Sequence, residues 1–141
     1  MKQLFTLAVL AITLLGGLTQ VSAQTTYNKD QHNYIVLTRK IPQLKAILLA
    51  AEELSTADGE AFGEFHVVIC GETVKGLTDM DQIQPFLDMA QSEKIKLLAC
   101  GFSLKKFGVD ATKLPKEMGV VDNGILYNFE LQKDGFLSIT L

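Results

Sequence analysis

Cys100 is the residue of this sequence best placed to do chemistry. It follows the apolar run 95–99 and is followed at once by Gly101. That placement predicts a thiol at the carboxyl end of a strand, and parallel sheets that alternate with helices bind their ligands at this edge. A thiolate there could attack a sulfane sulfur, hold it and yield it to a second thiol. The alternative is a buried structural cysteine, which behaves as a small apolar side chain.

Three neighbouring features favour the thiolate form of Cys100. Gly101 leaves room beside the sulfur, and a helix beginning near Ser103 would point its first backbone N–H groups toward it. Lys105 and Lys106 add positive charge nearby. Each of these would lower the pKa of the thiol and make it more nucleophilic.

Cys70, the second cysteine, also ends an apolar run and precedes Gly71. If the two cysteine-bearing strands are neighbours, Cys70 and Cys100 lie at the same edge of the sheet. They could form a disulfide if their Cα atoms come within about 7 Å. A redox couple, a simple staple and a core cysteine facing a helix all remain open for Cys70.

The other polar candidates have simpler interpretations. His66 lies four residues before Cys70, about 13 Å away at roughly 3.3 Å per strand residue, so we interpret it as a partly exposed strand histidine. His32 lies in a polar segment and is expected to be solvated. Asp122 and Asn123 could orient a ligand, but capping the next helix explains them better.

The first residues predict a secretory signal peptide, residues 1–23. Met1-Lys2-Gln3 gives a basic start, residues 4–18 are apolar, and Val21-Ser22-Ala23 forms a small-x-small cleavage site. An uncleaved anchor is the alternative, but the apolar run is shorter than the roughly 20 residues that cross a bilayer. We therefore expect a periplasmic or secreted protein with no membrane attachment after cleavage.

The remaining chain predicts one α/β domain. After a flexible lead-in, residues 24–33, strands are expected at 34–38, 65–70, 95–99, 118–121 and 136–140. Helices are expected from the apolar stripe at 44–54 to an end near 55–59, from 82 or 84 to 90, at 103–106 and at 124–133. This alternation predicts a three-layer α/β/α domain with a five-stranded, mostly parallel sheet over residues 34–141.

Composition and motifs exclude several classes of function. The formal net charge is −3 and the basic residues are scattered, which argues against a nucleic-acid partner. The histidines and cysteines at positions 32, 66, 70 and 100 match no zinc spacing, so no metal and no cofactor are expected. No glycine-rich phosphate loop or Ser-His-Asp constellation supports a kinase, a dinucleotide enzyme or a hydrolase.

Four segments together resemble the DsrE/DsrF-like family of sulfur-relay proteins. They are residues 99–104 (ACGFSL), 107–109 (FGV), 120–125 (VVDNGI) and 131–136 (LQKDGF), and the resemblance covers residues 34–141. It implies a five-stranded parallel sheet between helices and a homo-oligomer, a trimer or a hexamer. It also implies a cysteine after the third strand that carries persulfide sulfur between partner proteins, and Cys100 falls on that cysteine.

The resulting hypothesis is an exported, cysteine-based sulfur carrier or sulfurtransferase-like protein, with sulfur donor or acceptor proteins as partners. Its alternative is a non-catalytic oligomeric module that binds a ligand or a partner and contains a structural Cys70/Cys100 pair. The state of the thiols separates the two. A free, acidic and alkylatable Cys100 supports sulfur transfer, whereas an inert thiol or a stable disulfide supports the binding module.

Overall fold

One parallel sheet organises the chain. The computed structural model describes residues 27–141, and the predicted signal peptide, residues 1–23, lies outside them. The sheet order is β4-β3-β2-β1-β5, and every pairing is parallel. The strands are β1 (His32–Thr38), β2 (Phe62–Ile69), β3 (Ile95–Cys100), β4 (Gly119–Val121) and β5 (Leu137–Thr140). The predicted five-stranded parallel sheet is confirmed.

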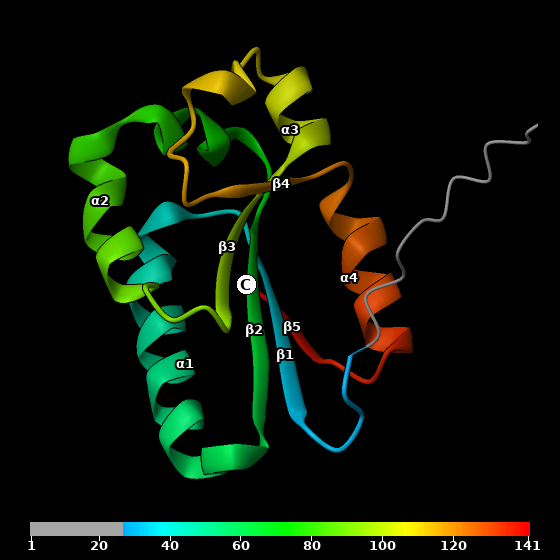
Figure 1. Ribbon diagram of the computed structural model, residues 1–141. Helices are drawn as coiled ribbons and strands as arrows, with labels where there is room; N and C mark the ends of the chain where they lie inside the picture. The colour runs from blue at the N-terminus through cyan, green and yellow to red at the C-terminus, as the bar shows by residue number, and fades with distance from the viewer. Residues whose placement is uncertain (1–26) are drawn as a thin grey trace, which may run out of the picture.

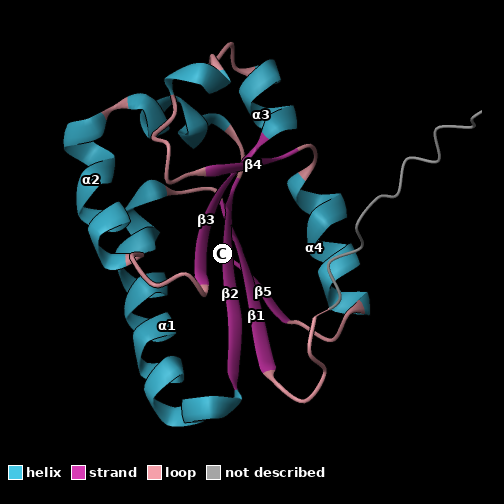
Figure 2. Cartoon of the chain, in the orientation of Figure 1, coloured by secondary structure: helices cyan, strands magenta, loops and turns pink. Residues whose placement is uncertain are grey.

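Helices cover both faces of this sheet, as Figures 1 and 2 show. Two helices, α1 (Leu44–Asp58) and α2 (Met80–Met89), lie on one face, and α4 (Gly124–Lys133) lies on the other. The short helix α3 (Gly101–Lys106) follows β3 directly. Short 3-10 helices complete the described chain: η1 (Ile41–Gln43), η2 (Gly59–Ala61), η3 (Glu72–Thr78) and η4 (Ala111–Lys113). Among the described residues, none of these helices is long and apolar enough to cross a membrane.

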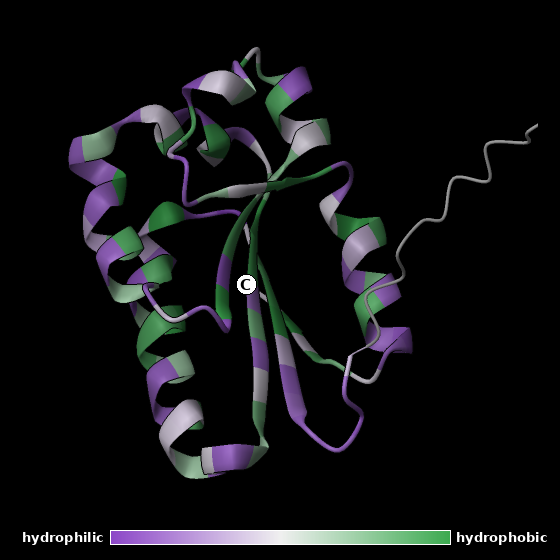
Figure 3. Ribbon diagram, in the orientation of Figure 1, coloured by the Kyte–Doolittle hydropathy of each residue, from purple (hydrophilic) through white to green (hydrophobic). Residues whose placement is uncertain are grey.

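The face under α1 and α2 contains the larger apolar core. The predicted stripe of α1 is confirmed there, since Leu44, Ile47, Leu48 and Ala51 are all buried. Burying a side chain of this size contributes about 1.5–3 kcal/mol. Along the helices of Figure 3, hydrophobic stretches alternate with hydrophilic ones, as expected for helices with one buried side. These contacts fix α1 and α2 against the sheet.

The face under α4 contains a smaller core of mixed chemistry. Its buried members are Ile35, Leu37, Val68, Cys70, Leu98, Cys100, Leu131 and Phe136. Both cysteines of the chain therefore belong to this layer. Tyr27 packs against it as well, edge-on to Phe136 with ring centroids 4.7 Å apart. Part of the predicted lead-in thus contacts the domain.

Several element boundaries differ from those expected, and two of the differences have a clear physical cause. Helix α2 begins at Met80, with Asp79 accepting the Asp81 N–H at 3.1 Å as its cap, so Pro85 lies within the helix rather than in its first turn. Pro85 and Asp81 are both exposed, and water can therefore hydrate the Asp81 carbonyl that loses its partner. Strand β1 begins at His32, inside the predicted lead-in, because the Asn33 amide oxygen accepts the Glu64 N–H of β2 at 2.8 Å.

Candidate functional site

The two cysteines follow paired positions at the carboxyl edge of the sheet. Strands β2 and β3 are neighbours, and their last paired residues are Ile69 and Ala99. Cys70 and Cys100 come next on each strand, and the Cys70 N–H still bonds to the Thr38 carbonyl of β1 at 2.9 Å. Both thiols are free, and they are only 8% and 4% exposed. The expectation that both lie at one sheet edge is confirmed.

Hydrogen-bond donors converge on Cys100. The N–H of Gly124, the first residue of α4, donates to the Cys100 sulfur at 3.3 Å. Burial by itself would raise the pKa of this thiol, but hydrogen bonds from Ser103, Gly124 and Cys70 outweigh it and hold the pKa below its ordinary value. The positive end of the α4 dipole acts in the same direction. Cys100 is thus a buried thiol whose pKa lies below its ordinary value.

Ser103 connects the ends of the two strands. Its hydroxyl oxygen accepts the Gly71 N–H at 2.9 Å, directly after Cys70, and its hydroxyl hydrogen is directed to Cys100. Helix α3 begins at Gly101 with Cys100 as its N-cap residue, so the expectation that Ser103 caps this helix is wrong. Ser103 is instead a buried donor inside the helix.

The predicted charge effect of the lysines is also absent. Lys105 and Lys106 form the last turn of α3, and the Lys106 ammonium lies over the Phe107 ring at 5.6 Å from its centroid. The pKa of Cys100 is lowered by hydrogen bonds, and neither lysine is among its causes. Helix α3 runs away from Cys100, so its basic end cannot lie beside the thiol.

Cys70 has the opposite acid–base character. Burial, the charge on Cys100 and a hydrogen bond to Cys100 together raise the pKa of Cys70 to about 12, against a smaller opposing effect of Arg39. Cys70 therefore stays protonated at neutral pH and donates its S–H to the Cys100 sulfur. The pair consists of one acidic and one very weakly acidic thiol.

Gly124 is a residue of this site that sequence reasoning missed. A Cβ atom there would lie 2.6 Å from the Cys70 sulfur and 2.7 Å from Val68 Cγ1, closer than real Cβ contacts occur. Gly101 has a similar role, because a Cβ there would approach the Val121 carbonyl oxygen at 3.1 Å. It makes room for the β4 backbone rather than for a ligand of the thiol. Both glycines let backbone pack directly against the cysteine pair.

His66 is fully buried, which corrects the expected partial exposure. Its Nε2 lies 2.6 Å from a Glu64 carboxylate oxygen, which also accepts from Lys96, and its Nδ1 lies 2.8 Å from the Tyr127 hydroxyl. Burial lowers the pKa of His66, so the ring is neutral and Nε2–H donates to Glu64. Tyr127 then donates to Nδ1. Because both ring nitrogens are engaged, His66 is not a free base for Cys70.

The remaining polar candidates have structural roles. Asn123 accepts the Ile125 and Leu126 N–H groups at 3.0 and 3.3 Å and caps α4, as expected. The Asp122 backbone carbonyl accepts the Phe102 N–H at 2.8 Å. His32 is exposed as predicted and pairs with Asp58 at 2.9 Å. In residues 27–141 no three His, Cys, Asp or Glu side chains gather in a way that could hold a metal ion.

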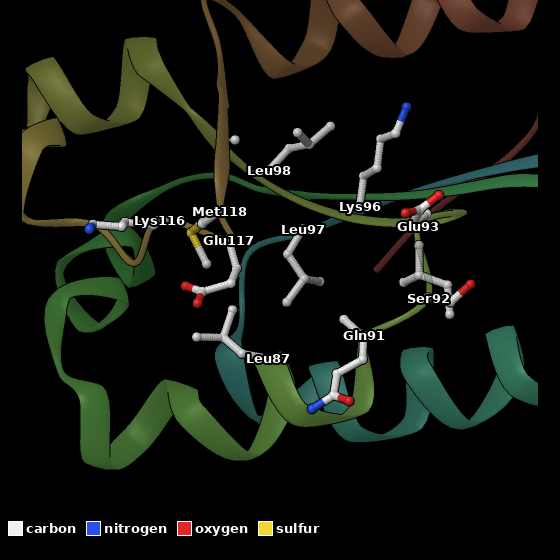
Figure 4. A pocket seen from close by; sticks show the side chains of 13 residues that line it. Leu87, Gln91, Ser92, Glu93, Lys96, Leu97, Leu98, Lys116, Glu117 and Met118 are labelled. Carbon is white, nitrogen blue, oxygen red and sulfur yellow. The ribbon is translucent and has the colours of Figure 1, made fainter.

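A cavity of about 690 Å³ lies away from the thiols, beside the amino-terminal half of β3. Figure 4 shows Leu87 and Leu97 at its apolar centre with Glu117 beside them, whereas Lys96 points away from Leu97. The Lys96 ammonium pairs with Glu64 at 2.6 Å. Neither cysteine lines this cavity. It is therefore separate from the chemistry at the opposite end of β3.

Comparisons with known proteins bear on the fold. No protein-family model matches the sequence, and no curated protein matches it. Among solved structures, MTH1491 from Methanobacterium thermoautotrophicum, a protein of unknown function, is similar with a TM-score of 0.61 and 19% identity. The match covers 79% of this chain and 100% of that chain. What the two share is the fold.

Proposed function

We propose that this protein is an exported sulfur carrier of the DsrE/DsrF-like type, in which Cys100 accepts and donates sulfane sulfur as a persulfide. The observation that supports it most is the convergence of donors on the Cys100 sulfur, including the Gly124 N–H at 3.3 Å. A carrier reacts as the thiolate, and a lowered pKa increases the thiolate fraction at neutral pH. Export rests on the signal-peptide pattern of residues 1–23.

The reaction would proceed by thiolate exchange. The Cys100 thiolate attacks the sulfane sulfur of a donor, the donor's S–S bond breaks, and its leaving sulfur keeps the electron pair. A second thiolate then attacks the outer sulfur of the Cys100 persulfide, and Cys100 leaves as the thiolate. Gly124, Ser103 and Cys70 stabilise the negative charge on Cys100 before loading and after release.

Burial shapes the choice of donor. Because Cys100 is only 4% exposed, a small inorganic donor such as hydropolysulfide fits the site better than a bulky one. A protein acceptor would meet the outer persulfide sulfur, which extends farther than the cysteine. The resemblance to the sulfur-relay family supports a donor or acceptor protein as partner.

A homo-oligomer, a trimer or a hexamer as in that family, is part of the proposal. Helix α4 exposes three large apolar side chains, Ile125, Leu126 and Phe129, each more than half exposed. Such side chains are typical of surfaces that another subunit covers. Tyr127, on the same helix, faces inward to His66 instead.

The alternative function is a non-catalytic binding module with a structural Cys70/Cys100 pair. Its supporting observation is the burial of both thiols in the apolar layer under α4. Buried cysteines of that kind are usually inert. The two functions differ in whether Cys100 reacts.

Intact mass spectrometry tests this proposal. The mature protein, reduced and desalted without oxygen, is treated with hydropolysulfide and mapped after trapping with iodoacetamide. In the Cys70→Ser variant we expect one added sulfur that maps to Cys100 and is removed by reductant. The Cys100→Ser variant is the matched control and should gain none. A Cys100 that neither gains sulfur nor reacts with iodoacetamide in the folded protein would exclude the carrier and leave the binding module.

A further inference from the structure

The Cys70 and Cys100 side chains lie next to each other in the layer under α4. Cys70 and Cys100 follow the last paired residues of β2 and β3, Ile69 and Ala99. Neighbouring strands lie about 4.8 Å apart, and disulfide-bonded Cα atoms lie about 4.4–6.8 Å apart. The two positions are therefore spaced for a disulfide without movement of either strand.

Their side chains also point to the same face of the sheet. Both pack in the layer under α4, and Cys70 donates its S–H to the Cys100 sulfur. Gly124 lies over both: a Cβ there would be 2.6 Å from the Cys70 sulfur and 3.4 Å from Cys100 Cβ. Because Gly124 has no side chain, it does not separate the two thiols.

This arrangement brings a second thiol to whatever sulfur Cys100 carries. Transfer to an external acceptor requires that acceptor to reach a residue that is 4% exposed. Cys70 needs no such approach, since it already contacts the inner sulfur. An intramolecular thiol this close has a very high effective concentration. Proximity therefore offsets the small fraction of Cys70 that is thiolate at neutral pH.

We propose that Cys70 is a resolving cysteine that reduces the Cys100 persulfide to hydrogen sulfide and leaves a Cys70–Cys100 disulfide. Cys70 sulfur attacks the inner sulfur of the persulfide, the bond between inner and outer sulfur breaks, and the outer sulfur leaves with the electron pair. The Cys70 proton goes to the departing hydrosulfide. The two cysteines supply both electrons, so this step needs no other reductant.

A second step restores the thiols. An external dithiol or small thiol attacks the Cys70–Cys100 disulfide and becomes oxidised in its place. The inference rests on the proposed function and changes its outcome: the site releases reduced sulfur as sulfide rather than passing sulfane sulfur onward. The high pKa of Cys70 keeps this thiol protonated until the leaving sulfur can take the proton.

The test compares sulfur-loaded wild type with Cys70→Ser. Both proteins, reduced and free of oxygen, receive equimolar hydropolysulfide, and sulfide and peptide disulfides are measured. Wild type should release one more sulfide per chain than Cys70→Ser and should contain the Cys70–Cys100 disulfide. Cys70→Ser should retain the persulfide on Cys100. The Cys100→Ser variant should form neither the disulfide nor a persulfide at residue 100.

Failure of this inference is distinguishable from failure of the proposed function. If both wild type and Cys70→Ser keep a stable persulfide on Cys100, the carrier stands and the resolving role is overturned. Sulfur that maps to Cys70 in wild type, with no disulfide, overturns it as well. If Cys70→Ser gains no sulfur and wild type forms neither persulfide nor disulfide, the proposed function and this inference fail together.

A second measurement tests the geometry without any sulfur donor. Diamide treatment of folded wild type should produce the Cys70–Cys100 disulfide within each chain. If the folded protein yields no such disulfide, the proposal is overturned. Circular dichroism melts confirm that Cys70→Ser is folded, and Cys70→Ala replaces it in the same assay if it is not.

Discussion

The two faces of the sheet are built for different purposes. The layer under α1 and α2 is mainly apolar, and its buried hydrophobic members come from helices, strands and 3-10 turns alike. The layer under α4 is smaller and includes both cysteines. Strand β2 and helix α4 also carry the buried polar residues His66 and Asn128. One face supplies most of the packing, and the other holds the groups that can react or titrate.

The polar groups under α4 are nonetheless fully paired. The Asn128 side-chain oxygen accepts from Gln132 at 2.5 Å and from Ser138 at 2.9 Å, and His66 is bonded through both ring nitrogens. Pairing removes the cost of about 1–3 kcal/mol that an unsatisfied buried polar group would impose. The reactive face is thus held by specific hydrogen bonds, whereas the opposite face is held mainly by apolar packing.

The largest expected effect lies on the apolar face. Leu48→Ala should lower the free energy of unfolding by about 2–5 kcal/mol, because Leu48 is buried and its removal leaves a cavity. Urea unfolding measures this, with the exposed Leu49→Ala as the control. The rate of Cys100 alkylation in the folded protein should stay unchanged. A large change in that rate would break the proposed division between the faces.

A smaller effect on stability, with a larger one on reactivity, is expected for Gly124→Ala. The new methyl group would overlap the Cys70 sulfur, which costs about 1–3 kcal/mol of overpacking. Displacement of α4 would also lengthen the bond from the residue-124 N–H to Cys100, so the pKa of that thiol should rise.

The pH dependence of alkylation at Cys100 measures this change. The matched control is Lys133→Ala, exposed and at the opposite end of α4, which should leave both the pKa of Cys100 and the stability near wild type. An unaltered alkylation profile in Gly124→Ala would show that the α4 N–H does not tune Cys100.

The smallest expected effect is a pH dependence of stability from His66. Burial lowers the pKa of folded His66 below its ordinary value of 6.5, so the unfolded chain binds this proton first as the pH falls. The stabilising contribution is complete above pH 6.5 and is lost as the pH falls from there through the folded pKa. Urea midpoints between about pH 8 and pH 5 measure the slope.

Two variants sharpen this measurement. His66→Gln should flatten the slope, whereas His32→Gln, at an exposed position, should keep it. An equal slope in wild type and His66→Gln would assign the effect to other groups. The result also reports on the two faces, because Tyr34, which packs against the apolar layer, has its pKa raised to about 12 and stays neutral between pH 5 and pH 8.

Much of the fold was predictable from local patterns. The alternation of strand-like and helix-like segments indicated the parallel sheet, and the i, i+3, i+4 spacing of Leu44, Ile47 and Leu48 identified the buried side of α1. Cys100 was found because strand ends are visible as the end of an apolar run. These signals depend on residues close together in the sequence.

The site's environment was less predictable, because it depends on distant segments. Ser103 looked like a cap, and only its contact with Gly71, from another strand end, reveals its role as a donor. Gly124 looked like an ordinary residue after a cap, yet it lies against Cys70 and Cys100. Lys105 and Lys106 were assigned by sequence distance alone, which ignores the direction of the helix.

The contact between the Gly124 N–H and the Cys100 sulfur has a spectroscopic consequence. An amide hydrogen bonded to sulfur responds to the electron density on that sulfur, so its NMR resonance and its exchange with solvent depend on whether Cys100 is ionised, neutral or covalently modified. The first turn of α4 is therefore an internal reporter of sulfur chemistry, readable in the native chain without any attached probe.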